Sequence, residues 1–267
     1  MLVVLCLSIA MSILSGCGSS GGDPAAPAQT DLSGVWQTTE VINGPPAPKA
    51  SIVPNMLNII QNGNTITGRS NMFSFTGTFD GTNINCTGTM LTTTISLALV
   101  LADDNTFGGT MTVNTGGAQT TYQITFAKRG TPAGTLAFTG TMDGTDLSIN
   151  STTAFGAKSG SSNNRWIYSL SHDRAVQIYI STVGDVAATT YTLVNNPVNA
   201  GEARMNLYHI EGTGDQYGDS ATGGTLTITS LTDDSMVGTF NVTGWGGVAG
   251  SLTGGSFNVQ NLVFLTK

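Results

Sequence analysis

Residues 73 to 86 read Phe-Ser-Phe-Thr-Gly-Thr-Phe-Asp-Gly-Thr-Asn-Ile-Asn-Cys. Apolar and polar side chains alternate on both sides of Asp80-Gly81, a dipeptide that is typical of tight hairpin turns. Alternation with a period of two predicts strands that have one apolar and one polar face. The stretch therefore predicts a β-hairpin, and similar short alternating runs occur through most of the chain.

The composition agrees with an all-β protein. The 267 residues include 35 Gly, only 9% are charged, and the net charge is -7. No long window shows the apolar period of 3.6 residues that indicates an amphipathic helix. Because Lys and Arg together number 9, a basic face for nucleic acid is not expected. The length suits two domains of ordinary size.

The first domain is predicted to span residues 31–129 and to be a small up-and-down antiparallel barrel. Asn62-Gly63 and Asp80-Gly81 supply hairpin signals between short strands, and sequential strands with short links favour a meander that closes on itself. The predicted strands are 32–40, 55–62, 64–70, 72–79, 82–90, 92–101, 105–114 and 119–127.

The first strand of this domain contains Gly34 and Trp36. These two residues resemble the Gly-x-Trp signature of the lipocalin superfamily. The resemblance implies that Trp36 closes the barrel floor and packs under a basic residue at the end of the last strand, for which Arg129 is the candidate. The first strand of avidin-like barrels has a similar sequence, so the signature also fits an antiparallel barrel of that kind.

Alternate residues of the predicted strands form one apolar set inside the barrel. Two alternatives follow: the set fills the barrel as a core, or it lines a cavity for an apolar small molecule, as the lipocalin resemblance implies. Pro45 to Pro48 would then form a stiff lid across the barrel mouth. The candidate lining residues are Phe73, Phe75, Ile84, Leu97, Leu99, Phe107, Tyr122 and Phe126.

The chain begins with an uncharged apolar run that ends in Leu14-Ser15-Gly16-Cys17. This tetrapeptide resembles the lipobox of bacterial lipoproteins, which implies a signal peptide over residues 1–16 and acylation of Cys17. Residues 17–30 would form a flexible tether, since Gly, Ser, Ala and Pro cannot bury apolar surface. Gly18 occupies the place where Asp would retain the protein in the inner membrane, so we expect an outer-membrane location. Cys86 is left without a partner and is expected to be buried.

The second domain is predicted to span residues 134–267 after a linker at 130–133. Its expected strands are 147–155, 165–171, 175–182, 189–194, 203–210, 224–230, 236–243 and 256–265. Residues 224–229, 238–240 and 255–259 resemble an uncharacterised β-sandwich domain of bacterial lipoproteins. The resemblance implies an antiparallel β-sandwich and brings no known activity. Phe138 to Thr145 echoes the earlier stretch from Phe75 to Thr82, which we attribute to shared hairpin chemistry.

Few residues suggest chemistry. His172 and His209 lie in no recognisable catalytic setting, so a structural role is expected for each, and no cofactor motif survives inspection. Glu211, Asp215 and Asp219 crowd one predicted loop and are a candidate Ca²⁺ site, with a solvated acidic loop as the alternative. Trp166, Tyr217 and Trp245 are candidate loop aromatics for a sugar or a protein partner, with rim packing as the alternative.

These features predict an exported lipoprotein without catalytic activity, metal or cofactor. It would meet the lipid bilayer through Cys17 and would not bind nucleic acid. The first hypothesis is a binding module for an apolar small molecule in the first barrel. The alternative is a surface lipoprotein for adhesion, or for glycan or protein binding, that acts through the loops of the second domain.

Overall fold

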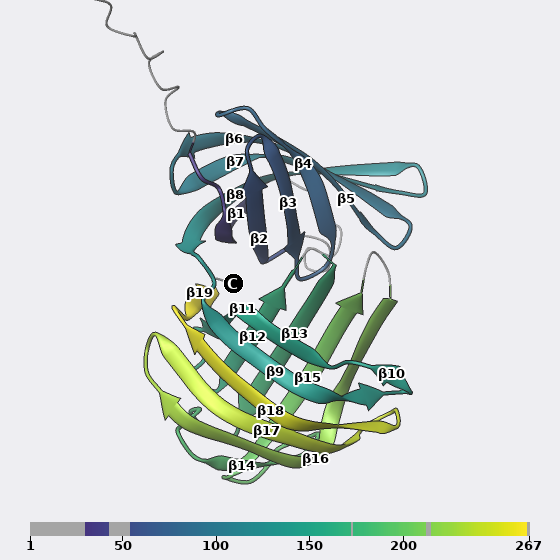
Figure 1. Ribbon diagram of the computed structural model, residues 1–267, viewed down its shortest axis with the longest axis vertical. Helices are drawn as coiled ribbons and strands as arrows, with labels where there is room; N and C mark the ends of the chain where they lie inside the picture. The colour runs from purple at the N-terminus through teal and green to yellow at the C-terminus, as the bar shows by residue number, and fades with distance from the viewer. Residues whose placement is uncertain (1–29, 43–53, 172, 212–214, 266–267) are drawn as a thin grey trace, which may run out of the picture.

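The computed structural model describes residues 30–42, 54–171, 173–211 and 215–265. The regular elements within these ranges are β-strands, and they form two closed antiparallel barrels stacked along the longest axis of the molecule (Figure 1). Within the same ranges, no helix has the length and apolar character needed to span a membrane. The all-β prediction is confirmed.

Barrel 1 is a meander in which each strand pairs with the next along the chain, and the last strand pairs with the first. Within β5 the burial alternates strictly, with Ile84, Cys86 and Gly88 inward. The predicted up-and-down barrel is therefore confirmed. Its strands are β1 (Gly34–Ile42), β2 (Met56–Asn62), β3 (Thr65–Ser70), β4 (Ser74–Phe79), β5 (Asn83–Met90), β6 (Thr93–Asp103), β7 (Thr106–Thr115) and β8 (Ala118–Gly130).

Barrel 2 begins four residues after β8 ends. Its wall is built from β9 (Gly134–Met142), β11 (Ile149–Ser159), β12 (Asn164–Leu170), β13 (Arg174–Thr182), β15 (Glu202–Glu211), β16 (Asp215–Leu231), β17 (Ser235–Trp245) and β18 (Gly250–Gln260). Three short strands pair with the wall strands. β10 (Thr145–Asp146) pairs with β9, β14 (Thr190–Leu193) lies between β15 and β16, and β19 (Val263–Leu265) pairs with β11.

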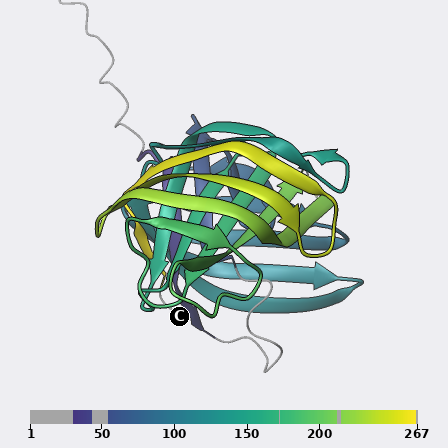
Figure 2. The same cartoon turned by 90° about the horizontal axis from the view of Figure 1, so that it is seen from below.

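The predicted β-sandwich is wrong, because the second sheet closes. β9 pairs with β11 on one edge and with β18 on the other, which joins the first and last wall strands into a ring (Figure 2). A sandwich would leave two separate sheets with free edges. The second domain is thus another meander barrel, and its core includes Leu136, Ile178, Met205, Leu226 and Phe240.

The two Asp-Gly hairpins lie at different places in the two barrels. Asp80-Gly81 connects β4 and β5 in the middle of barrel 1, whereas Asp143-Gly144 connects the first strand of barrel 2 to β10. Asp143 and Gly144 both have positive φ, 50° and 79°, as a type I′ turn requires. At Asp80-Gly81 only the glycine has a positive φ, 100°, and the loop between β4 and β5 has one residue more. The two stretches therefore share the Asp-Gly dipeptide but neither the turn type nor the position in the barrel.

The barrels contact each other through a third apolar cluster. Val35 and Met56 of barrel 1 pack against Tyr168 and Leu170 on the outside of barrel 2. The Asn58 side-chain amide, only 6% exposed, donates to the Leu170 carbonyl at 2.7 Å. The two barrels are therefore joined by buried side chains in addition to the covalent link.

A buried arginine lies at the same contact. Arg69 of β3 is 0% exposed, and its guanidinium donates to the Ile210 carbonyl of barrel 2 at 3.3 Å. Desolvation lowers the pKa of Arg69 to about 10, while the nearby Asp173 carboxylate acts in the opposite direction. A charged group in this position ties the orientation of barrel 1 to polar groups of barrel 2.

Candidate functional site

Trp36 is fully buried in the core of barrel 1. Its indole N–H donates to the Leu32 carbonyl at 2.8 Å, and its ring lies 4.2 Å from that of Phe107. The basic group over the ring is Lys128, whose Nζ lies 5.5 Å from the ring centroid. Arg129 is exposed and donates to the Gln37 side chain at 2.7 Å. Arg129 was expected to pack over Trp36, and the residue that does so is its neighbour Lys128. Successive side chains of a strand point to opposite sides, so Lys128 and Arg129 cannot both face Trp36.

The candidate lining residues lie inside barrel 1, but they touch one another. Of the set, only Tyr122 is partly exposed, while the other seven have exposed fractions of 0–3%. A cavity that could hold even a water molecule would leave accessible surface on the side chains around it. An open hollow of about 330 Å³ lies on the outer side of β4 to β6, where five Ser and Thr residues line it together with Phe75 and Gly88. This geometry favours the filled-core alternative.

Cys86 lies in the wall of this core. Burial raises the pKa of its thiol from 9.0 to about 12, so the nucleophilic thiolate is suppressed at neutral pH. The side chain acts as a small apolar group, and the geometry supplies no activated nucleophile here.

Several predicted residues lie outside the described part of the structure. Cys17, Pro45 to Pro48 and His172 belong to these positions, as do the side chains of Glu211, Asp215 and Tyr217. Asp219 is described, and its carboxylate accepts hydrogen bonds from the backbone N–H groups of Ser220 and Gly247, both at 2.7 Å. Among the described residues no group of His, Cys, Asp and Glu is arranged to hold a metal ion.

The loop aromatics separate into an inward and an outward residue. Trp245 is at the end of β17, pairs with Ala221 and is only 7% exposed within the core of barrel 2. It is therefore not the exposed loop residue that was expected. Trp166 is in β12 and not in a loop, and its half-buried side chain points outward.

Trp166 belongs to a larger outward surface that crosses three neighbouring strands. Register places Trp166 opposite Tyr179 and Tyr179 opposite Asn206; in the next row Gln177 lies opposite Tyr208. Arg204 lies one outward position before Asn206 on β15. We call this surface the aromatic face, and it consists of Trp166, Gln177, Tyr179, Arg204, Asn206 and Tyr208.

The rings of the aromatic face are held along the sheet. Trp166 and Tyr179 have ring centroids 5.2 Å apart. The Tyr179 hydroxyl donates to Asn164 at 2.9 Å, which keeps this ring down on the strands. Tyr208, 36% exposed, lies across Gly218, where an added Cβ would meet its ring at 2.8 Å. Trp166 also packs against the apolar cluster between the barrels, so part of its ring is covered, while Tyr208 is the most exposed ring of this face.

Polar groups beside the rings form one hydrogen-bonded network. Arg204 Nε and the Ser220 hydroxyl both donate to the side-chain oxygen of Asn206, each at 3.0 Å. The Asn206 amide nitrogen in turn reaches the Tyr208 hydroxyl at 3.4 Å. No carboxylate lies among the described residues that form the aromatic face, so the positive charge of Arg204 is not neutralised within it.

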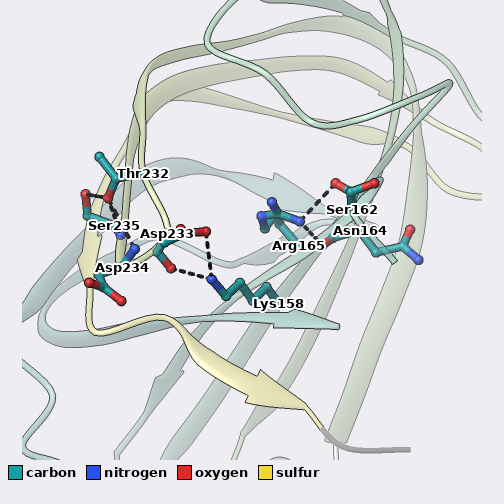
Figure 3. A network of polar contacts seen from close by, with 8 residues as sticks. All are labelled: Lys158, Ser162, Asn164, Arg165, Thr232, Asp233, Asp234 and Ser235. Carbon is teal, nitrogen blue, oxygen red and sulfur yellow. Dashed lines mark hydrogen bonds and ion pairs between the residues drawn. The ribbon is translucent and has the colours of Figure 1, made fainter. Parts of the chain in front are cut away.

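Contacts around Asn164 hold one end of the aromatic face. Arg165 Nη1 donates to the carbonyls of Ser162 and Asn164 at 3.0 and 2.8 Å (Figure 3). Desolvation lowers the pKa of Arg165, while Asp185 and Asp233 raise it. Lys158 binds the backbone and the side chain of Asp233, at 2.7 and 3.2 Å. The Arg165 bonds stabilise the turn that precedes Asn164, the residue that orients Tyr179, whereas the Lys158 bonds join β11 to the turn between β16 and β17.

His209 lies on the opposite, inward face of β15. It continues the alternation of Met205 and Leu207 and is fully buried. The hydroxyl groups nearest in register are Ser169 and, beyond it, Ser151, which bond to each other at 2.7 Å. Hydrogen bonds from Ser148 lower the pKa of Asp146, and Arg174 and His209 contribute to this shift, so the Asp146 carboxylate is electrostatically linked to His209.

Comparisons with protein-family models, curated proteins and solved structures yield no match. Asn206 is only 7% exposed and its side chain is already hydrogen-bonded within the face, so it orients its neighbours. The half-exposed rings can stack on a partner, and the Arg204 guanidinium beside them can donate hydrogen bonds to its edges. Sequence reasoning missed Tyr179 and Tyr208, although both stand at outward positions of predicted strands.

Proposed function

We propose that this chain is an exported, lipid-anchored glycan-binding protein that performs no catalysis itself. The observation that carries the proposal is the aromatic face on barrel 2. Sugar rings have apolar C–H faces and hydroxyl edges, so they suit flat aromatic rings flanked by Arg204 and Gln177. The filled interior of barrel 1 makes us prefer this function to an apolar carrier.

Anchoring rests on the lipobox resemblance around Cys17. An acylated Cys17 followed by a flexible tether would hold both barrels at a membrane surface. Metabolic labelling with palmitate tests this part: the wild-type chain should carry the label and partition into detergent, and Cys17→Ala should do neither. Labelling of the variant, or no labelling of the wild type, would reject the anchor.

Glycan binding is tested with the full-length protein in detergent on an array of neutral and acidic oligosaccharides. We expect retention of at least one glycan, with affinity then measured by calorimetry. Trp166→Ala and Tyr208→Ala should each weaken binding by about tenfold or more, as expected for truncation of an aromatic hot spot. Val198→Ala, at an apolar position that is 69% exposed outside the aromatic face, is the matched control.

Two results would overturn the glycan proposal. One is the absence of any retained oligosaccharide from a folded protein. The other is retention that Trp166→Ala and Tyr208→Ala leave unchanged, since binding would then lie elsewhere. Capture of a peptide ligand that both variants abolish would assign the aromatic face to a protein partner instead.

A further inference from the structure

The wall of barrel 2 has an open seam between β11 and β12. These strands pair only from Ala154 opposite Ser169 to Lys158 opposite Arg165, although β11 begins at Ile149. On its other edge β11 bulges against β9 between Ser151 and Ala154. Bulges bend a strand and redirect its side chains, and they are frequent beside binding sites. The first residues of β11 therefore diverge from the hairpin that connects β12 and β13.

Side chains bridge the seam where backbone pairing is missing. The Ser169 hydroxyl donates to that of Ser151 at 2.7 Å, and Arg174 Nη1 donates to the Ser148 carbonyl at 2.7 Å. Within β11, the backbone N–H of Thr153 donates to the Ser151 hydroxyl at 3.2 Å, which holds Ser151 in place for its bond to Ser169. These contacts hold the two edges at a fixed separation without closing the wall.

An open hollow of about 420 Å³ lies over the seam. Its polar lining includes the hydroxyls of Ser151, Thr153, Ser169 and Ser171 together with Asp173 and Arg174. Hydroxyl groups both donate and accept hydrogen bonds, the carboxylate accepts and the guanidinium donates. Because both signs of charge are present, the hollow does not select an anion or a cation by net charge.

We propose that this seam binds a small, neutral, polyhydroxylated molecule of the size of a mono- or disaccharide. Such a ligand matches the lining, since each of its hydroxyls can donate to one group and accept from another. Recognition here is by hydrogen bonding along diverging strands, because no aromatic ring lines the hollow. The seam shares no residue with the aromatic face, so the proposal does not depend on the glycan function assigned to that face.

The experiment is nuclear magnetic resonance on the full-length chain with glucose, galactose, N-acetylglucosamine and myo-inositol as probes. Glucuronate and glycine betaine represent anionic and zwitterionic ligands. We expect saturation transfer to at least one neutral probe, with amide shifts at residues 149–153, 171, 173 and 174. Ser171→Ala and Arg174→Gln should each weaken this binding by about tenfold. Thr121→Ala, an exposed hydroxyl on barrel 1, should leave it unchanged.

Each contrary outcome is distinct. Absence of transfer to every neutral probe, binding of glucuronate or betaine alone, or shifts that spare the seam residues would overturn the proposal. Ser171 is exposed, so its variant tests the seam even if Arg174→Gln fails to fold. Trp166→Ala should leave the amide shifts at the seam unchanged, which separates a failure of the seam from a failure of the aromatic face.

Discussion

Cys86 shows how burial alone sets the reactivity of a residue. Its thiol pKa is raised to about 12 by desolvation, with no charged group among the causes. We expect that the folded protein resists iodoacetamide in mildly alkaline buffer and that urea makes Cys86 react at the rate of a free thiol. Mass spectrometry of the alkylated chain checks this. Rapid labelling without denaturant would contradict the buried position.

The same shift predicts a pH dependence of stability. Below pH 9.0 the Cys86 thiol is neutral in the folded and unfolded states, so the full stability is present. Between 9.0 and about 12 the unfolded chain ionises and the folded chain does not, so the free energy of unfolding falls as pH rises. Urea unfolding of Cys86→Ala across this range should lack this part of the decline.

At the scale of the element, hairpin β4–β5 depends on a close approach at Gly77. A Cβ added there would meet the Asn85 carbonyl oxygen at 2.0 Å and the Cys86 Cα at 2.6 Å. Because these are backbone atoms, Gly77→Ala should lower the free energy of unfolding by about 1–3 kcal/mol. Gly108 on β7 is the matched control, since its nearest neighbours would lie 3.3 Å away. Urea denaturation should show a much smaller effect of Gly108→Ala, and equal effects would refute the packing argument.

At the scale of the whole molecule, the contact between the barrels should couple their unfolding. Asn58→Ala removes the bond to the Leu170 carbonyl and leaves a buried acceptor unpaired, which costs about 1–3 kcal/mol. We expect one calorimetric transition for the wild type and two for this variant. Asn85→Ala, at an exposed position of barrel 1, should retain a single transition. Two transitions in the wild type would show that the barrels unfold independently.

Much of the first barrel could be read from the sequence because its signals are local. Alternation with a period of two and turn residues such as Asp80-Gly81 act between neighbours in the chain, and these determined strand positions and the inward set that contains Phe107. Of the aromatic face, the sequence singled out Trp166. The partners of that residue come from β13 and β15, and only strand register places Tyr179 and Tyr208 beside it.

Only the tertiary structure decided whether the second sheet closes into a barrel and which side chains point inward. A strand with alternating residues fits a sandwich or a barrel equally well, and the difference arises when β9 pairs with both β11 and β18. The pairing of β17 with β16 places Trp245 in the core of barrel 2. The register of β8 on β1 places Lys128 over the ring of Trp36. Local periodicity determines which residues share a face of one strand, whereas hydrogen bonds between strands distant in the chain determine which edges meet and which surfaces remain exposed.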